Sequence, residues 1–236
     1  MKIIVLCLAN DENGYDQMVK ACRNTWGSIS AEGLKIYYIY GHRNGIEKQD
    51  QTFAIEDCIY SPTPEGRHNL FIKTINAFEW LLNNEEFDYI LRCNCGSYVD
   101  LKILQQACID RGIRDNIYAG EQCEFSGIKY ASGAAFLISH NLVKDIVSDK
   151  HQISYIEMDD VTIGRYLTQY KNILPIPIGT EKYKATHINL YDENLYDPHK
   201  ITQNLDHYFH YYFNQRIVGK NSNLPYVIHQ IKQKIK

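Results

Sequence analysis

Long apolar runs and amphipathic segments alternate along the first two thirds of the chain. Runs of buried-type residues predict strands at 2–9, 34–40, 55–60, 87–92 and 117–120. Strands that are covered on both faces of a sheet show such continuous runs, and this is typical of parallel sheets. The pattern therefore predicts several strands in the interior of a mainly parallel sheet.

Helices are predicted between these strands, near 14–26, 67–83 and 100–111. In the second of them, Phe71, Ile75, Phe78 and Leu82 are spaced i, i+4, i+7 and i+11, which gives one apolar stripe. Strands that alternate with helices predict an α/β fold whose helices cover both faces of the sheet. Ligands of such folds bind outside the carboxyl ends of the strands.

The pattern changes after residue 120. The segment "YASGAAFLIS" (130–139) predicts a strand followed by a helix from about 140, and "MDDVTIGRYL" predicts a helix with Asp159 and Asp160 in its first turn. Alternate prolines make "LPIPIG" extended. We therefore expect one domain over 1–195. An aromatic and basic helical extension, 196–236, is expected to pack on the same domain.

Charge and cysteine usage narrow the class of protein. The formal net charge of −3 for 236 residues argues against a nucleic-acid partner, because such domains carry a concentrated basic footprint. Seven scattered cysteines without CxxC spacing favour reduced thiols and a cytoplasmic location. The run "IIVLCLA" is followed at once by Asn10 and two acidic residues, so it indicates a first strand rather than a signal peptide.

Five segments, in order, resemble the inverting β-1,3-glycosyltransferases that include Fringe and the β-1,3-galactosyltransferases. They are "ACRNTWG" (21–27), "NLFIKT" (69–74), "ILRCNCGSYVD" (90–100), "YASGAAFLIS" (130–139) and "DDVTIG" (159–164). The resemblance implies a GT-A-like fold. It also implies transfer of a sugar, with inversion, from a nucleotide-sugar (a UDP-sugar above all) to a hydroxyl of a glycan or lipid-linked saccharide.

The resemblance assigns the catalytic base to Asp160, the second acidic residue of its segment. An inverting transfer needs one base that removes the proton of the attacking hydroxyl. The alternative for Asp160 is a helpful charge in the first helical turn, and for Asp159 it is an N-cap. Ser132, Gly133, Ala134 and Asp159 are expected to line the acceptor side, although small residues also serve tight packing.

Binding of the nucleotide-sugar donor is predicted for residues near the carboxyl ends of the first strands. Arg23 offers a fork of donors to a uracil or phosphate, and Asn69 and Lys73 share one helix face. Ordinary surface and core roles explain these three residues as well. The full set of predicted donor contacts is Asn10, Arg23, Asn69, Lys73, Arg92, Asn94, Gly96, Ser97 and His187, and for His187 a core histidine is the alternative.

The segment "RCNCGS" departs from the family. Where the family has an Asp triplet that holds a divalent metal, this chain has Asn94, Cys95 and Gly96. Hard cations such as Mn²⁺ and Mg²⁺ favour anionic oxygen ligands, and a thiol suits them poorly. We therefore expect no metal cofactor, with Mn²⁺ or Mg²⁺ as the fallback, and a diphosphate bound directly by Arg92, Ser97 and backbone amides.

Two readings compete with an active transferase. A family member without the Asp triplet could be a pseudoenzyme that binds a glycan or a partner protein, although the retained "DDVTIG" speaks against it. A nucleotide-sugar hydrolase on the same fold would need a water-activating site that the sequence does not show.

The terminal "VIHQIKQKIK" is either a solvated helix or a weak attachment to an anionic membrane surface.

Overall fold

The structure is a computed structural model that describes residues 1–10, 15–42, 50–97, 99–155 and 158–177. It also gives the backbone of two further strands, β8 (Ala185–Asn189) and β9 (Tyr208–Tyr212). The basic end of the chain lies outside the described residues, so the predicted membrane contact stays a prediction. β9 is a strand within the extension predicted to be helical, and it pairs in parallel with β8.

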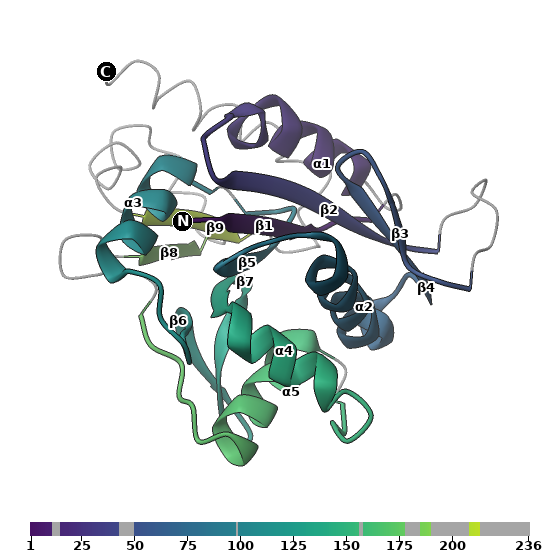
Figure 1. The fold of residues 1–236 in the computed structure, drawn as a ribbon, viewed down its shortest axis with the longest axis vertical. Helices are drawn as coiled ribbons and strands as arrows, with labels where there is room; N and C mark the ends of the chain where they lie inside the picture. The colour runs from purple at the N-terminus through teal and green to yellow at the C-terminus, as the bar shows by residue number, and fades with distance from the viewer. Residues whose placement is uncertain are drawn as a thin grey trace.

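A seven-stranded sheet with the order β3-β4-β2-β1-β5-β7-β6 forms the centre of the described chain (Figure 1). Its strands are β1 (Ile3–Leu8), β2 (Leu34–His42), β3 (Phe53–Ile55), β4 (Cys58–Pro64), β5 (Tyr89–Asn94), β6 (Tyr118–Phe125) and β7 (Ile128–Ser139). β1 pairs in parallel with β2 and β5, and β2 pairs in parallel with β4, while β3, β6 and β7 pair antiparallel. The sheet is mainly parallel at its centre, as the sequence predicts.

Helices cover both faces of this sheet (Figure 1). α1 (Tyr15–Asn24) and α3 (Leu101–Arg111) pack on one face, and α2 (Leu70–Asn84), α4 (His140–Ser148) and α5 (Asp159–Arg165) on the other. β1 contributes to both cores: Val5 and Cys7 face α1, whereas Ile4 and Leu6 face α2. This two-sided burial explains the continuous apolar run of the sequence.

Two hairpins differ from the sequence prediction. The strand expected at 55–60 is interrupted by a turn at Glu56 and Asp57, which separates β3 from β4. The strand expected at 117–120 continues to Phe125 and turns at Ser126 and Gly127, both with positive φ, into β7. A two-residue turn with two positive φ angles matches the twist of paired strands, and the glycine is its sequence signal.

The remaining connections agree with the sequence. Ile176, in the proline-rich segment, is extended beside β6: its N–H donates to the Tyr118 carbonyl, and its carbonyl accepts from Gly120. Asp100 caps α3 by accepting from the backbone N–H groups of Lys102 and Ile103. α5 is followed by a π-helical turn at Tyr166–Tyr170.

Candidate active site

Some of the predicted chemistry-bearing residues gather where β5 and β7 meet α5. β5 ends at Asn94, and β7 runs antiparallel to it with Ala135 opposite Cys93. Gly133 therefore reaches the same edge of the sheet as Asn94. α5 packs against β7 there and brings its first residues, Asp159 and Asp160, to this edge.

Gly133 lies between the side chains of Asp160 and Arg92. Its N–H donates to Oδ2 of Asp160 at 2.7 Å, and its carbonyl oxygen accepts from Nη1 of Arg92. A Cβ on Gly133 would lie 2.7 Å from Asp160 Oδ2 and 3.0 Å from Arg92 Nη1. A Cβ here would make one of the two side chains shift, so glycine allows both to approach the backbone this closely.

Arg92 forms a buried ion pair with Asp159. Nη2 of Arg92 lies 2.7 Å from Oδ1 of Asp159, and both side chains are 2% exposed. Thr74 on α2 donates to Oδ2 of the same carboxylate at 2.8 Å. The N-cap of α5 is Met158 instead. Both oxygens of Asp159 are thus engaged inside the protein, which counts against its predicted contact with an acceptor and against the N-cap alternative.

Arg92 also reaches the segment where the family has its Asp triplet. Nη1 of Arg92 donates to Oδ1 of Asn94 at 3.1 Å, and the guanidinium lies 5.6 Å from the ring centre of Phe136. Nε of Arg92 is buried and has no hydrogen-bond partner in the described chain. One guanidinium therefore connects the end of β5, the backbone of β7 and the first residue of α5.

The Asp160 carboxylate differs from that of Asp159. It is half-buried, and its oxygens accept from the N–H groups of Gly133 and Val161. Burial raises the pKa of Asp160 above its usual value and the Asp159 charge raises it further, while Arg92 and the two amides oppose the rise. A carboxylate with a raised pKa is a better proton acceptor than an ordinary one, and functional sites favour such perturbed groups.

Ser97 holds the turn after β5 through two hydrogen bonds to the protein interior. Ser97 is fully buried, its hydroxyl donates to the Ala134 carbonyl at 2.6 Å, and its own carbonyl accepts from the indole of Trp26 at 3.1 Å. Cys95 and Gly96 are buried as well, and Asn94 is half-buried. The Ser97 hydroxyl is thus directed into the protein, so its contacts favour a structural role over donor binding.

Two predicted donor cations are already paired. Nζ of Lys73 lies 2.7 Å from Oε2 of Glu65 and 3.0 Å from the Ala9 carbonyl, with side chains 3% and 9% exposed for Lys73 and Glu65. Arg23 pairs with Asp57 at 2.6 Å. Glu65 and Asp57 were not singled out by the sequence, although each sits in a turn next to β4.

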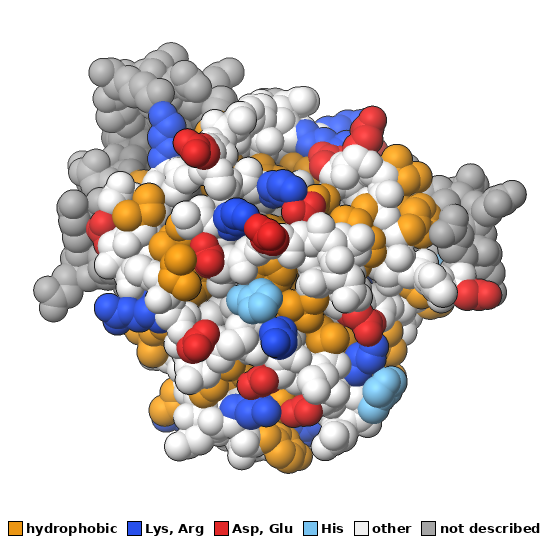
Figure 2. Space-filling view, in the orientation of Figure 1, with side chains coloured by type: hydrophobic (Ala, Val, Ile, Leu, Met, Phe, Trp, Pro, Cys, Tyr) orange, Lys and Arg blue, Asp and Glu red, His pale blue; other side chains and the backbone are white. Residues whose placement is uncertain are grey.

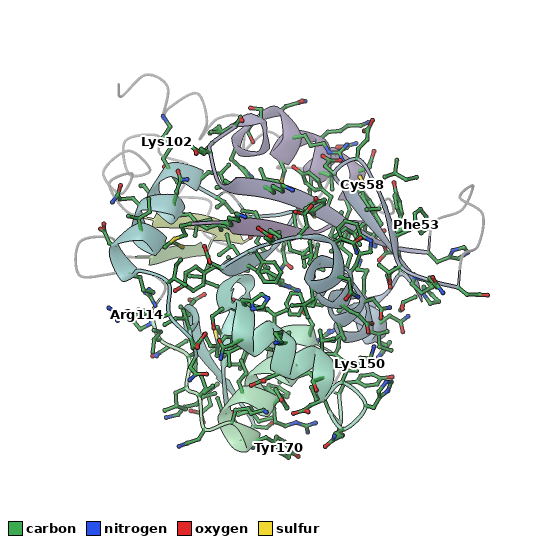
Figure 3. The ribbon with its side chains drawn as sticks, in the orientation of Figure 1. Phe53, Cys58, Lys102, Arg114, Lys150 and Tyr170 are labelled. Carbon is green, nitrogen blue, oxygen red and sulfur yellow. The ribbon has the colours of Figure 1, made fainter. Side chains whose placement is uncertain are left out.

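The Arg23–Asp57 pair lies away from Asp160. Its guanidinium stacks over Tyr38 at 4.6 Å and contacts the sulfur of Cys58 at 3.0 Å. Figure 3 shows Cys58 on the α1 side of the sheet, near β3 and far from α5. The structure thus does not bring Arg23 to Asp160.

The structure gives fewer contacts for the remaining predicted site residues. Asn10 follows β1 with Ala9 between them, and Asn69 is at the N-cap position of α2 but makes no side-chain capping hydrogen bond; both are half-buried. Ser132, beside Gly133, is half-buried, and its hydroxyl accepts from the Ala134 N–H at 3.3 Å. His187 lies on β8, whose side chains are outside the described part of the structure, so its role stays a prediction.

The described residues form no metal-binding cluster, and the face shown in Figure 2 has no concentrated basic patch. Among the residues that the structure describes, no group of three or more His, Cys, Asp or Glu side chains is arranged to hold a metal ion. On the face shown in Figure 2, basic and acidic side chains are intermixed. No helix in the described ranges is long and apolar enough to cross a bilayer.

Comparisons with known proteins point in one direction. The model of the Galactosyltransferase family matches residues 121–176, which include β7 and α5. A β-1,3-N-acetylgalactosaminyltransferase 2 of Xenopus tropicalis, named for the donor UDP-GalNAc, is 18% identical over 169 residues, which are 62% of this chain. The match covers 33% of that relative, so the chain matches about a third of its length.

The fold is also similar to a solved structure. A glycosyltransferase involved in glycosylation of the major capsid of PBCV-1 matches with a TM-score of 0.54 and 10% sequence identity. The match covers 95% of this chain and 100% of that one. At this identity the likeness concerns the fold, and it agrees with the GT-A-like arrangement expected from the sequence.

Proposed function

We propose that this chain is a divergent member of the Fringe and β-1,3-galactosyltransferase-like family of GT-A proteins and that it is a glycosyltransferase, because both the family model and the curated relative that it matches are those of sugar transferases. It transfers a sugar from a nucleotide-sugar, with inversion, to a hydroxyl of a glycan acceptor. The observation that carries the proposal is the Asp160 carboxylate, whose Oδ2 accepts from the Gly133 N–H at 2.7 Å and which follows Asp159 of the buried Arg92–Asp159 pair in the chain. The part of the chain that matches the family model contains both Gly133 and Asp160.

The proposed chemistry is a single displacement. Asp160 takes the proton of the acceptor hydroxyl, the hydroxyl oxygen bonds to the anomeric carbon, and the bond to the nucleotide diphosphate breaks on the opposite face. The raised pKa of Asp160 suits this proton transfer. Ser132, Gly133 and Ala134 line the acceptor side, and Asp159 acts as the counterion of Arg92 instead of contacting the acceptor.

Asn94 and the backbone of its turn are the proposed diphosphate contacts. Oδ1 of Asn94 accepts from Arg92, so its NH₂ group remains to donate to a phosphate oxygen. The amides of Cys95 and Ser97 already donate to the carbonyls of Leu8 and Asn94. We therefore assign the diphosphate to the Asn94 side chain and the Gly96 backbone, with Asn10 and Asn69 at the nucleoside. Preorganised donors of this kind stabilise the charge that develops on a leaving group.

We also propose that the transfer is metal-independent, on the basis of the same residues. The neutral amide of Asn94 stands where the family has a carboxylate, and its Oδ1 already accepts a hydrogen bond from Arg92. Without carboxylates at this point, the diphosphate is also not repelled. We expect transfer to be unaffected by excess EDTA and not raised by Mn²⁺ or Mg²⁺.

The test is a transfer assay with a panel of UDP-, GDP- and dTDP-sugars and oligosaccharide acceptors, run in EDTA and in Mn²⁺. Transfer from a UDP-sugar that is equal under both conditions is the expected result, and the anomeric configuration of the product reports inversion. Activity that disappears in EDTA and returns with Mn²⁺ would overturn metal independence. Donors that bind, as seen by thermal shift, without transfer to any acceptor would instead identify a pseudoenzyme.

A further inference from the structure

Tyr155 is an exposed aromatic residue in the loop between α4 and α5. Its side chain is directed to the surface, and the residue is 52% exposed. One face of the ring stacks on Phe71 of α2, with the ring centres 5.8 Å apart and the planes inclined by 18°. Phe71 is itself 3% exposed, so a buried ring supports the exposed one.

The chain just before Tyr155 is held by two contacts. The carbonyl of Ser154 accepts a hydrogen bond from the guanidinium of Arg165 on α5, and Ile153 packs against the core under α2 and α4. The outer face of the Tyr155 ring is therefore presented by a backbone that is already held in place. A rigid aromatic surface binds a ligand with little loss of conformational freedom.

Two neighbouring residues of α2 contact Tyr155 and the residue that precedes the proposed base. Phe71 and Thr74 are three residues apart on the helix, so they are neighbours on one face, about 5–6 Å apart at Cβ. Phe71 supports Tyr155, and Thr74 donates to Asp159, the residue before Asp160. Arg67, just before α2, contacts the sulfur of Met158 at 3.5 Å and adds a charged polar side chain to the same rim.

We propose that Tyr155 forms a subsite for the acceptor, where it stacks on a neutral pyranose ring next to the sugar that carries the reacting hydroxyl. This inference rests on the proposed function. A pyranose has an apolar face of C–H groups, and the electron-rich face of an aromatic ring attracts such groups as well as hiding them from water. The offset of one helical turn from the Thr74–Asp159 contact favours the neighbouring sugar over the reacting one, so the subsite selects acceptors of two or more sugars.

The test compares Tyr155→Ala and Tyr155→Phe with Tyr170→Ala. Tyr170 is a matched control, because it is 71% exposed, stacks on Tyr166 at 6.2 Å and lies at the end of the π-helical turn, where Figure 3 labels it. Binding of the neutral disaccharides lactose, cellobiose and maltose, and of their monosaccharides, is measured by saturation-transfer NMR, which needs no turnover. We expect Tyr155→Ala to weaken binding of a disaccharide about three- to tenfold, and Tyr155→Phe and Tyr170→Ala to leave it unchanged.

The kinetic counterpart uses the donor and acceptors identified by the transfer assay. Tyr155→Ala should raise KM for a disaccharide acceptor by a similar factor, with KM for the donor and kcat for a monosaccharide acceptor unchanged. Equal effects on mono- and disaccharides, or equal loss in Tyr170→Ala, would overturn the subsite. No disaccharide binding to the wild type would overturn it too. Binding without any transfer would refute the proposed reaction while leaving the subsite intact.

Discussion

Two buried ion pairs lie at the carboxyl edge of the sheet. Each contains a cation that the sequence predicts to bind the donor, but only one of them has a further carboxylate beside it. We call Arg92, Gly133, Asp159 and Asp160 the base cluster, and Lys73 with Glu65 the α2 pair. In both, a cation expected to bind the donor pairs with a buried carboxylate at 2.7 Å. The base cluster contains a second carboxylate, Asp160, that no Lys or Arg pairs with among the described residues, whereas the two charges of the α2 pair cancel.

The comparison shows that a motif identifies the residues that gather at a site but not the charges that remain available there. The segment "NLFIKT" contains Lys73 but not Glu65, which neutralises it. The segment "DDVTIG" contains both acids, yet only contact with Arg92 separates the counterion, Asp159, from the proposed base, Asp160. Each prediction below tests whether this division between structural and reactive charges holds.

The largest effect is expected for Asp160→Asn. The change removes the proton acceptor and keeps the size of the side chain, so turnover should fall by roughly 10²–10⁴. Donor binding, measured by thermal shift or calorimetry, should stay nearly unchanged because we propose that Asp160 contacts the acceptor and not the donor. Wild-type turnover in this variant would transfer the role of base to another residue.

Much of the fold follows from local sequence. The buried runs of β1, β2 and β5 and the apolar stripe of α2 are local patterns, and the structure confirms them. The hairpin at Ser126 and Gly127 was missed because its polar residues lack a continuous apolar run. Its only signal was the Ser-Gly pair.

The site follows from sequence only in part. Gly133 and Asp160 lie on a strand and a helix that pack together, so their motifs were sufficient to suggest a common site. The partners of the cations were not predictable, because Asp159 is 67 residues from Arg92 along the chain and no periodicity links them. The orientation of the Ser97 hydroxyl, toward Ala134, is likewise set by tertiary packing.

The next largest effect is expected on the free energy of unfolding, where variants of the Arg92–Asp159 pair are compared with variants of the Lys73–Glu65 pair. Arg92→Met and Lys73→Met each leave a buried carboxylate without its cation, which costs about 3–5 kcal/mol of unfolding free energy. The double variants Arg92→Met/Asp159→Leu and Lys73→Met/Glu65→Leu remove both charges, and most of that loss should be recovered. Urea unfolding measures both steps.

Transfer activity of the two double variants should distinguish the base cluster from the α2 pair. The base-cluster double variant should stay inactive, because Arg92 also holds the Gly133 carbonyl and Asn94. The α2 double variant should keep most of its activity, because Lys73 is neutralised and 3% exposed. Loss of donor affinity in a folded α2 double variant would instead support the predicted contact between Lys73 and the donor.

The smallest effect is a pH dependence of stability that has opposite signs at two aspartates. Burial and the Asp159 charge raise the pKa of Asp160, so the folded state holds this proton at pH values where the unfolded chain has released it. The free energy of unfolding should therefore fall as pH rises from the ordinary value of 3.8 through the raised pKa, by at most about 1.4 kcal/mol per pH unit. Asp160→Asn should remove this fall.

Asp149 is the control of opposite sign. Hydrogen bonds from Tyr166 and Lys171 lower the pKa of Asp149, so its ionised form is favoured by folding. Its contribution is present above the ordinary pKa and is lost as pH falls through the lowered one, and Asp149→Asn should remove a rise in stability with pH. Urea unfolding of the wild type and both variants between pH 3 and pH 8 resolves the two slopes. The same pH slope in the wild type and Asp160→Asn would mean that Asp160 titrates as an ordinary surface carboxylate, and the contrast between the base cluster and the α2 pair would then lose its electrostatic basis.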